Sequence, residues 1–171
     1  MKAIIWDCRV VALIEILKVN NPRILVLLET RVQGHRSLEI LRRTCFSKVE
    51  RVEARGFAGG IWMFWSESLV NIELIDANNK SISAIVRRTC EMDWLLTVIY
   101  ARPHYSTRET LWEYICGLNN AVKGLWMLAV DLNTVVKESE KRGGAPFDRA
   151  KCQGFLNCMH HCCLIDLGFN D

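Results

Sequence analysis

Short apolar runs that end at an acidic residue are the feature that most constrains this fold. Asp7, Glu29 and Asp131 each follow such a run, AIIW, ILVLL and LWMLAV respectively. Short continuous apolar runs bounded by polar positions predict buried strands. The chain is therefore expected to fold in layers around a β-sheet, with an acidic residue at the end of each of these strands.

Helical patterns lie between the strands. The clearest covers residues 106–124, where Ser106 and Glu109 form a capping-box pattern and apolar residues recur on one face from Leu111 onward. Further helices are predicted over residues 10–19, 37–43 and 149–163. In residues 61–100, successive apolar runs joined by short polar turns predict an antiparallel meander. Its expected strands cover residues 61–65, 69–75, 82–86 and 94–100, and one more strand is expected over residues 164–169.

The mixture of βαβ-like and hairpin segments predicts an α/β or α+β fold with a mixed sheet. A length of 171 residues suits one domain or part of a larger one. Gly59–Gly60 and Gly143–Gly144 are too short to be phosphate-binding loops, and we interpret them as positions that permit a tight backbone path.

Composition limits the function without defining it. The net charge of +3 permits contact with a phosphate backbone but does not require it. No apolar run is long enough to span a bilayer, and no signal peptide is evident, so we expect an intracellular chain without a membrane partner. The 8 cysteines are then expected to be reduced thiols. Oligomeric state is not indicated.

One group of cysteines stands close together in the sequence. Cys152, Cys158, Cys162 and Cys163 fall in a predicted helix that also holds His160 and His161. A zinc site is one interpretation, but no C-x2-C pair is present. We favour the alternative that these cysteines are small buried apolar residues.

The three acids carry the strongest chemical signal. In layered α/β folds, ligands bind beyond the carboxyl ends of the strands. Carboxylates converging there repel one another unless a cation joins them, and oxygen ligands suit Mg²⁺ or Mn²⁺. Asn133, two residues after Asp131, would face the same side of an extended segment. Tyr100 also ends an apolar run, and its hydroxyl could donate a hydrogen bond to a phosphate. The alternative is that the acids only mark strand exits into solvent and that Tyr100 is packing.

Seven segments resemble, in order, the endonuclease domains of plant LINE-type retroelements. Residues 1–9 resemble a W-N-C-R-G opening, and residues 24–31 an L-x-E-T strand. The other matches are to G-x-x-G-G at residues 56–65, to Y-x-x-P at 94–103, to G-D-F-N at 126–133, and to family segments at 140–147 and 163–169.

That family belongs to the endonuclease/exonuclease/phosphatase superfamily. The resemblance implies a DNase I-like four-layer sandwich of two mixed sheets flanked by helices, Mg²⁺, DNA as partner and phosphodiester hydrolysis. By position, Glu29 and Asp7 would lie at the metal. Asp131 would align or deprotonate the attacking water, Asn133 would position that water or the phosphate, and Tyr100 would contact the phosphate. An endonuclease of this kind would meet DNA in the nucleus.

Several departures from the family pattern lower the expected activity. Asp7 replaces an Asn, and Val130 and Leu132 replace the Gly and Phe that flank the family's Asp. The S-D-H motif that carries the family's catalytic His has no counterpart. We therefore expect a single domain over residues 1–171 that is incomplete at its C-terminus and weakly active or inactive. The alternatives are a non-catalytic nucleic-acid or protein binding module, a phosphoesterase for phosphoinositides or nucleotides, and a vestigial gene product.

Overall fold

The computed structural model describes residues 10–30, 35–54, 59–89, 91–101, 109–131, 143, 148 and 150–167. The side chains of residues 10–12, 35, 36, 109 and 151 are not included in this description. The chain divides into two compact units. The first comprises Met1–Tyr100 and Gly124–Asp131, and the second Ala101–Lys123 and Leu132–Asp171.

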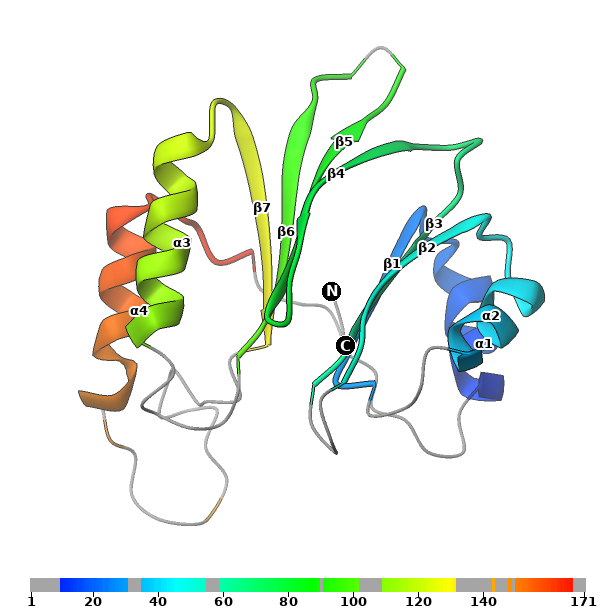
Figure 1. The fold of residues 1–171 in the computed structure, drawn as a ribbon, viewed down its shortest axis with the longest axis horizontal. Helices are drawn as coiled ribbons and strands as arrows, with labels where there is room; N and C mark the ends of the chain where they lie inside the picture. Colours follow the sequence, from blue (N-terminus) through cyan, green and yellow to red (C-terminus); the bar gives the residue numbers. More distant parts are fainter. Residues whose placement is uncertain are drawn as a thin grey trace. The chain divides into compact units, whose positions relative to one another are not determined.

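The first unit holds both sheets of the described chain (Figure 1). One sheet has three antiparallel strands in the order β1-β3-β2, and the other has four strands in the order β4-β5-β6-β7. Among the strands of the described residues, only β6 and β7 pair in parallel. The strands are β1 (Ile24–Leu28), β2 (Lys48–Val52), β3 (Ile61–Trp65), β4 (Asn71–Ala77), β5 (Ser81–Arg87), β6 (Trp94–Tyr100) and β7 (Leu125–Asp131).

Alternation along β1 and β3 builds two cores on the two faces of the first sheet. Leu25, Leu27, Trp62 and Phe64 face the helices α1 (Val10–Asn20) and α2 (His35–Arg43), where Leu13 completes the cluster. The alternate residues of the same strands face the second sheet. These alternate residues are Val26, Leu28, Ile61 and Met63. They form one core with the second-sheet residues Ile82, Ala84, Val86, Leu96 and Val98.

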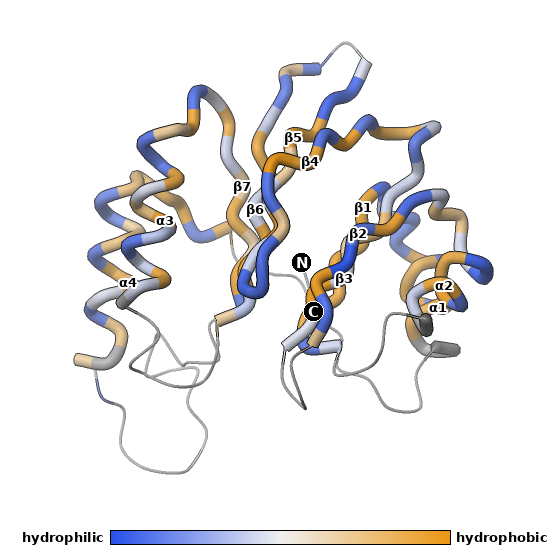
Figure 2. Tube along the Cα trace, in the orientation of Figure 1, coloured by the Kyte–Doolittle hydropathy of each residue, from blue (hydrophilic) through white to orange (hydrophobic). Residues whose placement is uncertain are grey.

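The described residues of the second unit form two helices, α3 (Glu109–Ala121) and α4 (Ala150–His161). The Asp148 carboxylate accepts a hydrogen bond of 3.0 Å from the Ala150 backbone N–H, which satisfies a donor at the start of α4. Both helices carry hydrophilic and hydrophobic residues interleaved along their length, as Figure 2 shows. Amphipathic helices of this kind bury one face, and here Leu111 and Ile115 of α3 are buried. No helix of the described residues is both long and apolar enough to cross a membrane.

The mixed α/β class, with two sheets and helices, is confirmed, and several element predictions need correction. The antiparallel meander covers only β4, β5 and β6, because β3 belongs to the other sheet. β4 continues through Asp76 and Ala77, where a turn was expected, after an irregularity in its pairing at Leu74. α2 begins at His35 rather than residue 37, and α4 covers Ala150–His161 rather than 149–163.

One strand was missed by sequence analysis, and one strand prediction was wrong. β2 was not predicted, because KVERV contains charged residues and no apolar run. The strand expected at residues 164–169 is absent over 164–167, and residues 168 and 169 lie outside the described part. Cys163 has a positive φ of 52°, which ends α4 in a tight turn, and Ile165 and Leu167 are then 82% and 80% exposed. Apolar character alone therefore did not indicate a strand there.

Candidate functional site

The carboxyl ends of two strands from different sheets meet at a hydrogen bond. Glu29 directly follows β1, and Tyr100 is the last residue of β6. The Tyr100 hydroxyl donates to the Glu29 carboxylate Oε1 over 3.2 Å. Tyr100 is only 4% exposed and belongs to the core between the two sheets, whereas Glu29 is half-buried. This contact joins two residues that sequence analysis proposed for one site.

Asp131 reaches the same end of the second sheet. It is the last residue of β7 and is the register partner of Tyr100 in the parallel β6–β7 pair. Registered residues of neighbouring strands share one face of a sheet, and Ala129, two residues earlier, packs into the core that contains Tyr100. The register therefore places Asp131 on the side of Tyr100, where it is half-buried.

Backbone geometry sets the direction of the Glu29 side chain. Glu29 has a φ of 55°, in the left-handed region that a non-glycine residue rarely adopts. An ordinary continuation of β1 would place this residue on the same face as Leu25 and Leu27, which contact the helices. The left-handed turn breaks that alternation, and the carboxylate instead meets Tyr100. Backbone strain of this sort persists where surrounding structure enforces it, most often at functional sites.

Two glycines before β3 lie close to Tyr100 and to Thr30, the residue after Glu29. Gly59 and Gly60 have φ values of 84° and 93°, which confirms the tight backbone path predicted for this pair. A Cβ at Gly59 would lie 3.6 Å from the Tyr100 ring. A Cβ at Gly60 would collide with the Thr30 hydroxyl. Gly60 therefore allows the backbone before β3 to approach the residue next to Glu29.

Thr30 adds an observation that sequence analysis missed. It is fully buried, and its hydroxyl has no hydrogen-bond partner among the described residues. A buried hydroxyl without a partner is costly, so such a group points to an additional polar neighbour at this place. The T of the L-x-E-T segment was the one sequence signal for it.

Two predicted site residues cannot be placed. Asp7 and Asn133 lie outside the described residues, so their positions relative to Glu29 and Asp131 stay predictions. The described donors are carboxylate oxygens, the Tyr100 phenol and the Thr30 hydroxyl. This oxygen-only donor set fits a hard cation such as Mg²⁺ or Mn²⁺, and not a soft one.

A shallow groove of about 550 Å³ lies in the same unit. Its lining residues are Arg51, Val52, Glu53, Ala54, Ala77, Asn78 and Asn79. Ala54 also lies next to Gly60, so the groove begins close to the glycine that contacts Thr30. Because its walls carry one charge of each sign, the groove alone does not select an anion.

Comparison with solved structures identifies the fold. An AP endonuclease from Archaeoglobus fulgidus has a TM-score of 0.66 at 16% identity, over 89% of this chain and 65% of that one. AP endonuclease LMAP from Leishmania major has a TM-score of 0.65 at 12% identity, over 90% of this chain and 61% of that one. TDP2 of D. rerio, complexed with a single-strand DNA product, has a TM-score of 0.57 at 16% identity, over 74% and 54%. No family model and no curated protein matches the sequence.

The chain therefore has the mixed α/β architecture of the DNase I-like fold, and its structural neighbours belong to the endonuclease/exonuclease/phosphatase superfamily. It spans less than two thirds of the length of the two AP endonucleases. At these identities the similarity defines the fold and not the reaction.

Proposed function

We propose that this chain is a nuclease-type module that hydrolyses phosphodiester bonds of DNA with the help of Mg²⁺ or Mn²⁺, and that its activity is weak. The observation that carries the proposal is the 3.2 Å contact between Tyr100 and Glu29, with Asp131 in register beside Tyr100. These are the described residues that the retroelement resemblance assigns to the site. Their meeting at strand ends of a DNase I-like fold supports that assignment.

In the proposed mechanism, each side chain has a distinct role. Glu29, with Asp7, would hold the cation, which when bound neutralises charge on the phosphate and lowers the pKa of water. Asp131 would accept a proton from the attacking water, and Asn133 would orient that water or the phosphate. Tyr100 would orient the Glu29 carboxylate while no substrate is bound, and its single hydroxyl proton would turn to a phosphate oxygen when substrate binds.

Weak activity follows from the residues that depart from the family pattern. No S-D-H motif occurs in these 171 residues, so the proposal assigns none of them to the role of the family's His, which stabilises charge and supplies a proton. Val130 stands where the family has a Gly, and a β-branched residue stiffens this position. We further propose an origin in a plant LINE-type retroelement, on the strength of the ordered motifs.

Plasmid nicking by the 171-residue chain tests the reaction. We expect slow nicking that needs Mg²⁺ or Mn²⁺ and disappears in Asp131→Asn. Glu113→Gln, which changes an exposed carboxylate of α3, is the matched control and should nick like the parent. Fast nicking would contradict the weak-activity proposal, and equal nicking by all three proteins would contradict the site.

Cation binding tests the site even if turnover is undetectable. Titration with Mn²⁺, followed by electron paramagnetic resonance, should show one site that is weakened in Glu29→Gln and unchanged in Glu113→Gln. Salt-sensitive DNA binding by a chain that shows neither cation binding nor nicking would instead indicate the non-catalytic binding module.

A further inference from the structure

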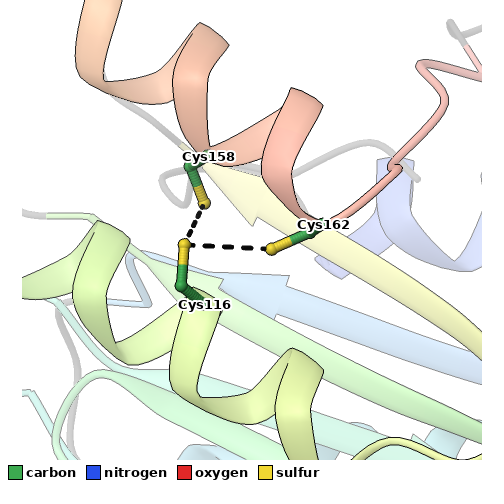
Figure 3. Close-up of side chains that lie close together, drawn as sticks. All are labelled: Cys116, Cys158 and Cys162. Carbon is green, nitrogen blue, oxygen red and sulfur yellow. Dashed lines mark hydrogen bonds between the residues drawn. The ribbon is translucent and has the colours of Figure 1, made fainter.

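Three cysteine thiols converge in the second unit, whereas Glu29, Tyr100 and Asp131 belong to the first. Cys116 comes from α3 and Cys158 from α4, and Cys162 lies in the turn that directly follows α4. Figure 3 shows the three sulfur atoms pointing toward one another. Cys158 and Cys162 are buried at 4% and 7% exposure, and Cys116 is half-buried.

The distances between the sulfur atoms suit a single metal ion. The Cys116 Sγ lies 3.7 Å from the Cys158 Sγ and 3.9 Å from the Cys162 Sγ, and all three lie within 4.8 Å of one another. With zinc–sulfur bonds of about 2.3 Å, tetrahedral geometry separates two sulfur ligands by about 3.8 Å. Small rotations of the side chains would therefore bring all three sulfur atoms into bonding distance of one ion.

The helix pair holds these thiols in place by contacts of its own. The rings of Trp112 and Phe155 lie 5.4 Å apart across the two helices. Gly154 lets α4 approach Trp112 so closely that an added Cβ would lie 2.9 Å from its ring. Cys158 follows one turn later, with its Sγ 3.9 Å from the Trp112 carbonyl oxygen. Packing thus presents the thiols together, so that a metal would enter a preformed site.

Neighbouring residues that sequence analysis grouped with these cysteines play a different part. Cys163 is exposed, so the prediction of a buried residue was wrong at this position, and His160 and His161 are exposed as well. Cys152 is buried, as predicted, but it is not one of the converging thiols. The α3 cysteine was missed because no local spacing relates residue 116 to residues 158 and 162. Burial of Cys158 and Cys162 confirms the prediction of small buried residues, and their convergence with Cys116 adds a chemical capacity to it.

We propose that Cys116, Cys158 and Cys162 form a three-thiolate site for Zn²⁺. Thiolates are soft ligands that select Zn²⁺ or Cu⁺ over the hard cations expected at Glu29 and Asp131. Three thiolates leave a net charge of minus one around Zn²⁺ and minus two around Cu⁺, and the smaller charge is less costly in a largely buried place. Each thiol releases its proton to solvent on binding, and a water completes the fourth position of the ion.

A disulfide between Cys116 and either Cys158 or Cys162 is the competing chemistry. It would require a sulfur–sulfur distance of about 2.05 Å and an oxidant, and it would leave the third thiol unused. The near-equal distances from the Cys116 Sγ to the Sγ atoms of Cys158 and Cys162 favour a shared ion instead.

Metal binding by the reduced 171-residue chain tests the proposal. After chelator treatment and desalting, the chain should take up one Zn²⁺, measured by competition with a chromophoric chelator. Co²⁺ at the same site should give thiolate-to-cobalt charge-transfer absorption. Cys116→Ser should weaken Zn²⁺ binding by at least about tenfold, since even residues behind the ligands contribute factors of that size.

Cys163→Ser is the matched control, because it removes an exposed thiol that adjoins the cluster in sequence. It should bind Zn²⁺ and give the cobalt absorption like the parent. Circular dichroism establishes that each variant is folded. A folded, reduced chain that retains no Zn²⁺, or equal loss in both variants, would overturn the proposal. Because nicking is not the readout, failure here is independent of the proposed nuclease function.

Discussion

At Glu29 the left-handed backbone, and not only the carboxylate, is expected to affect stability. A left-handed conformation costs an L-residue about 1–2 kcal/mol, which glycine avoids. Alanine also raises the free energy of unfolding by about 0.4–1 kcal/mol relative to glycine, because it lowers the conformational entropy of the unfolded chain. Both Glu29→Gly and Glu29→Ala lose the contact with Tyr100, so their difference isolates the backbone. We expect Glu29→Gly to be the more stable by up to about 1 kcal/mol in urea denaturation.

Glu50 in the middle of β2 provides the matched pair of substitutions. In a strand, glycine is less favourable than alanine by about 0.5–1 kcal/mol, so Glu50→Ala should be more stable than Glu50→Gly. The order of the two variants should therefore reverse between the two positions. The same order at both would show that Glu29 is not strained.

Sequence patterns predicted which residues end strands, but not which of them touch. Glu29 and Tyr100 each follow or end an apolar run, and this indicated their place at a sheet edge. Their contact spans 71 positions of the chain and joins two different sheets. It also depends on a positive φ at Glu29, for which a glutamate gives no signal. Long-range pairing and an unusual backbone angle are set by the packed fold, and local pattern does not contain them.

The α3–α4 contact yields a prediction for whole elements. Gly154→Ala adds a Cβ 2.9 Å from Trp112, and overpacking of this kind costs about 1–3 kcal/mol. Gly117 of α3 has nothing within 4 Å of an added Cβ, so Gly117→Ala should instead stabilise the helix by about 1 kcal/mol. Thermal unfolding followed by circular dichroism should show opposite shifts. Stabilisation by both substitutions would mean that the helices do not approach closely at Gly154.

Strand prediction was most accurate for the most apolar segments and failed for a charged strand at a sheet edge. The runs of β1, β3 and β6 are strongly apolar, and these strands begin and end where the sequence predicted. β2 has only two Val residues among three charged ones, and its place at the edge of the sheet lets it keep them. An edge strand needs less apolar surface, so its pattern is weaker.

At the scale of the whole molecule, the buried thiols should make stability depend on pH. Burial, followed by the hydrogen bond with Cys116, raises the pKa of the Cys158 thiol above its ordinary value of 9.0, and burial also raises the pKa of Cys162. The folded state thus favours the protonated thiols. In the unfolded chain the same thiols ionise near pH 9.0. Their contribution to stability is complete below that pH and is lost as pH rises toward the folded-state pKa.

We therefore expect the free energy of unfolding to fall as pH rises above 9.0, with a chelator present so that no metal binds. Urea denaturation across this range measures the slope, which reflects the protons bound in the two states. Cys158→Ala should reduce the slope, because one of the thiols that binds its proton more tightly in the fold is gone. It should also lower stability at every pH, because the smaller side chain leaves a cavity. Cys163→Ala removes an exposed thiol and should keep the parent slope. Equal slopes in all three proteins would mean that the cluster does not hold its protons more tightly in the fold, and that other groups set the alkaline limit.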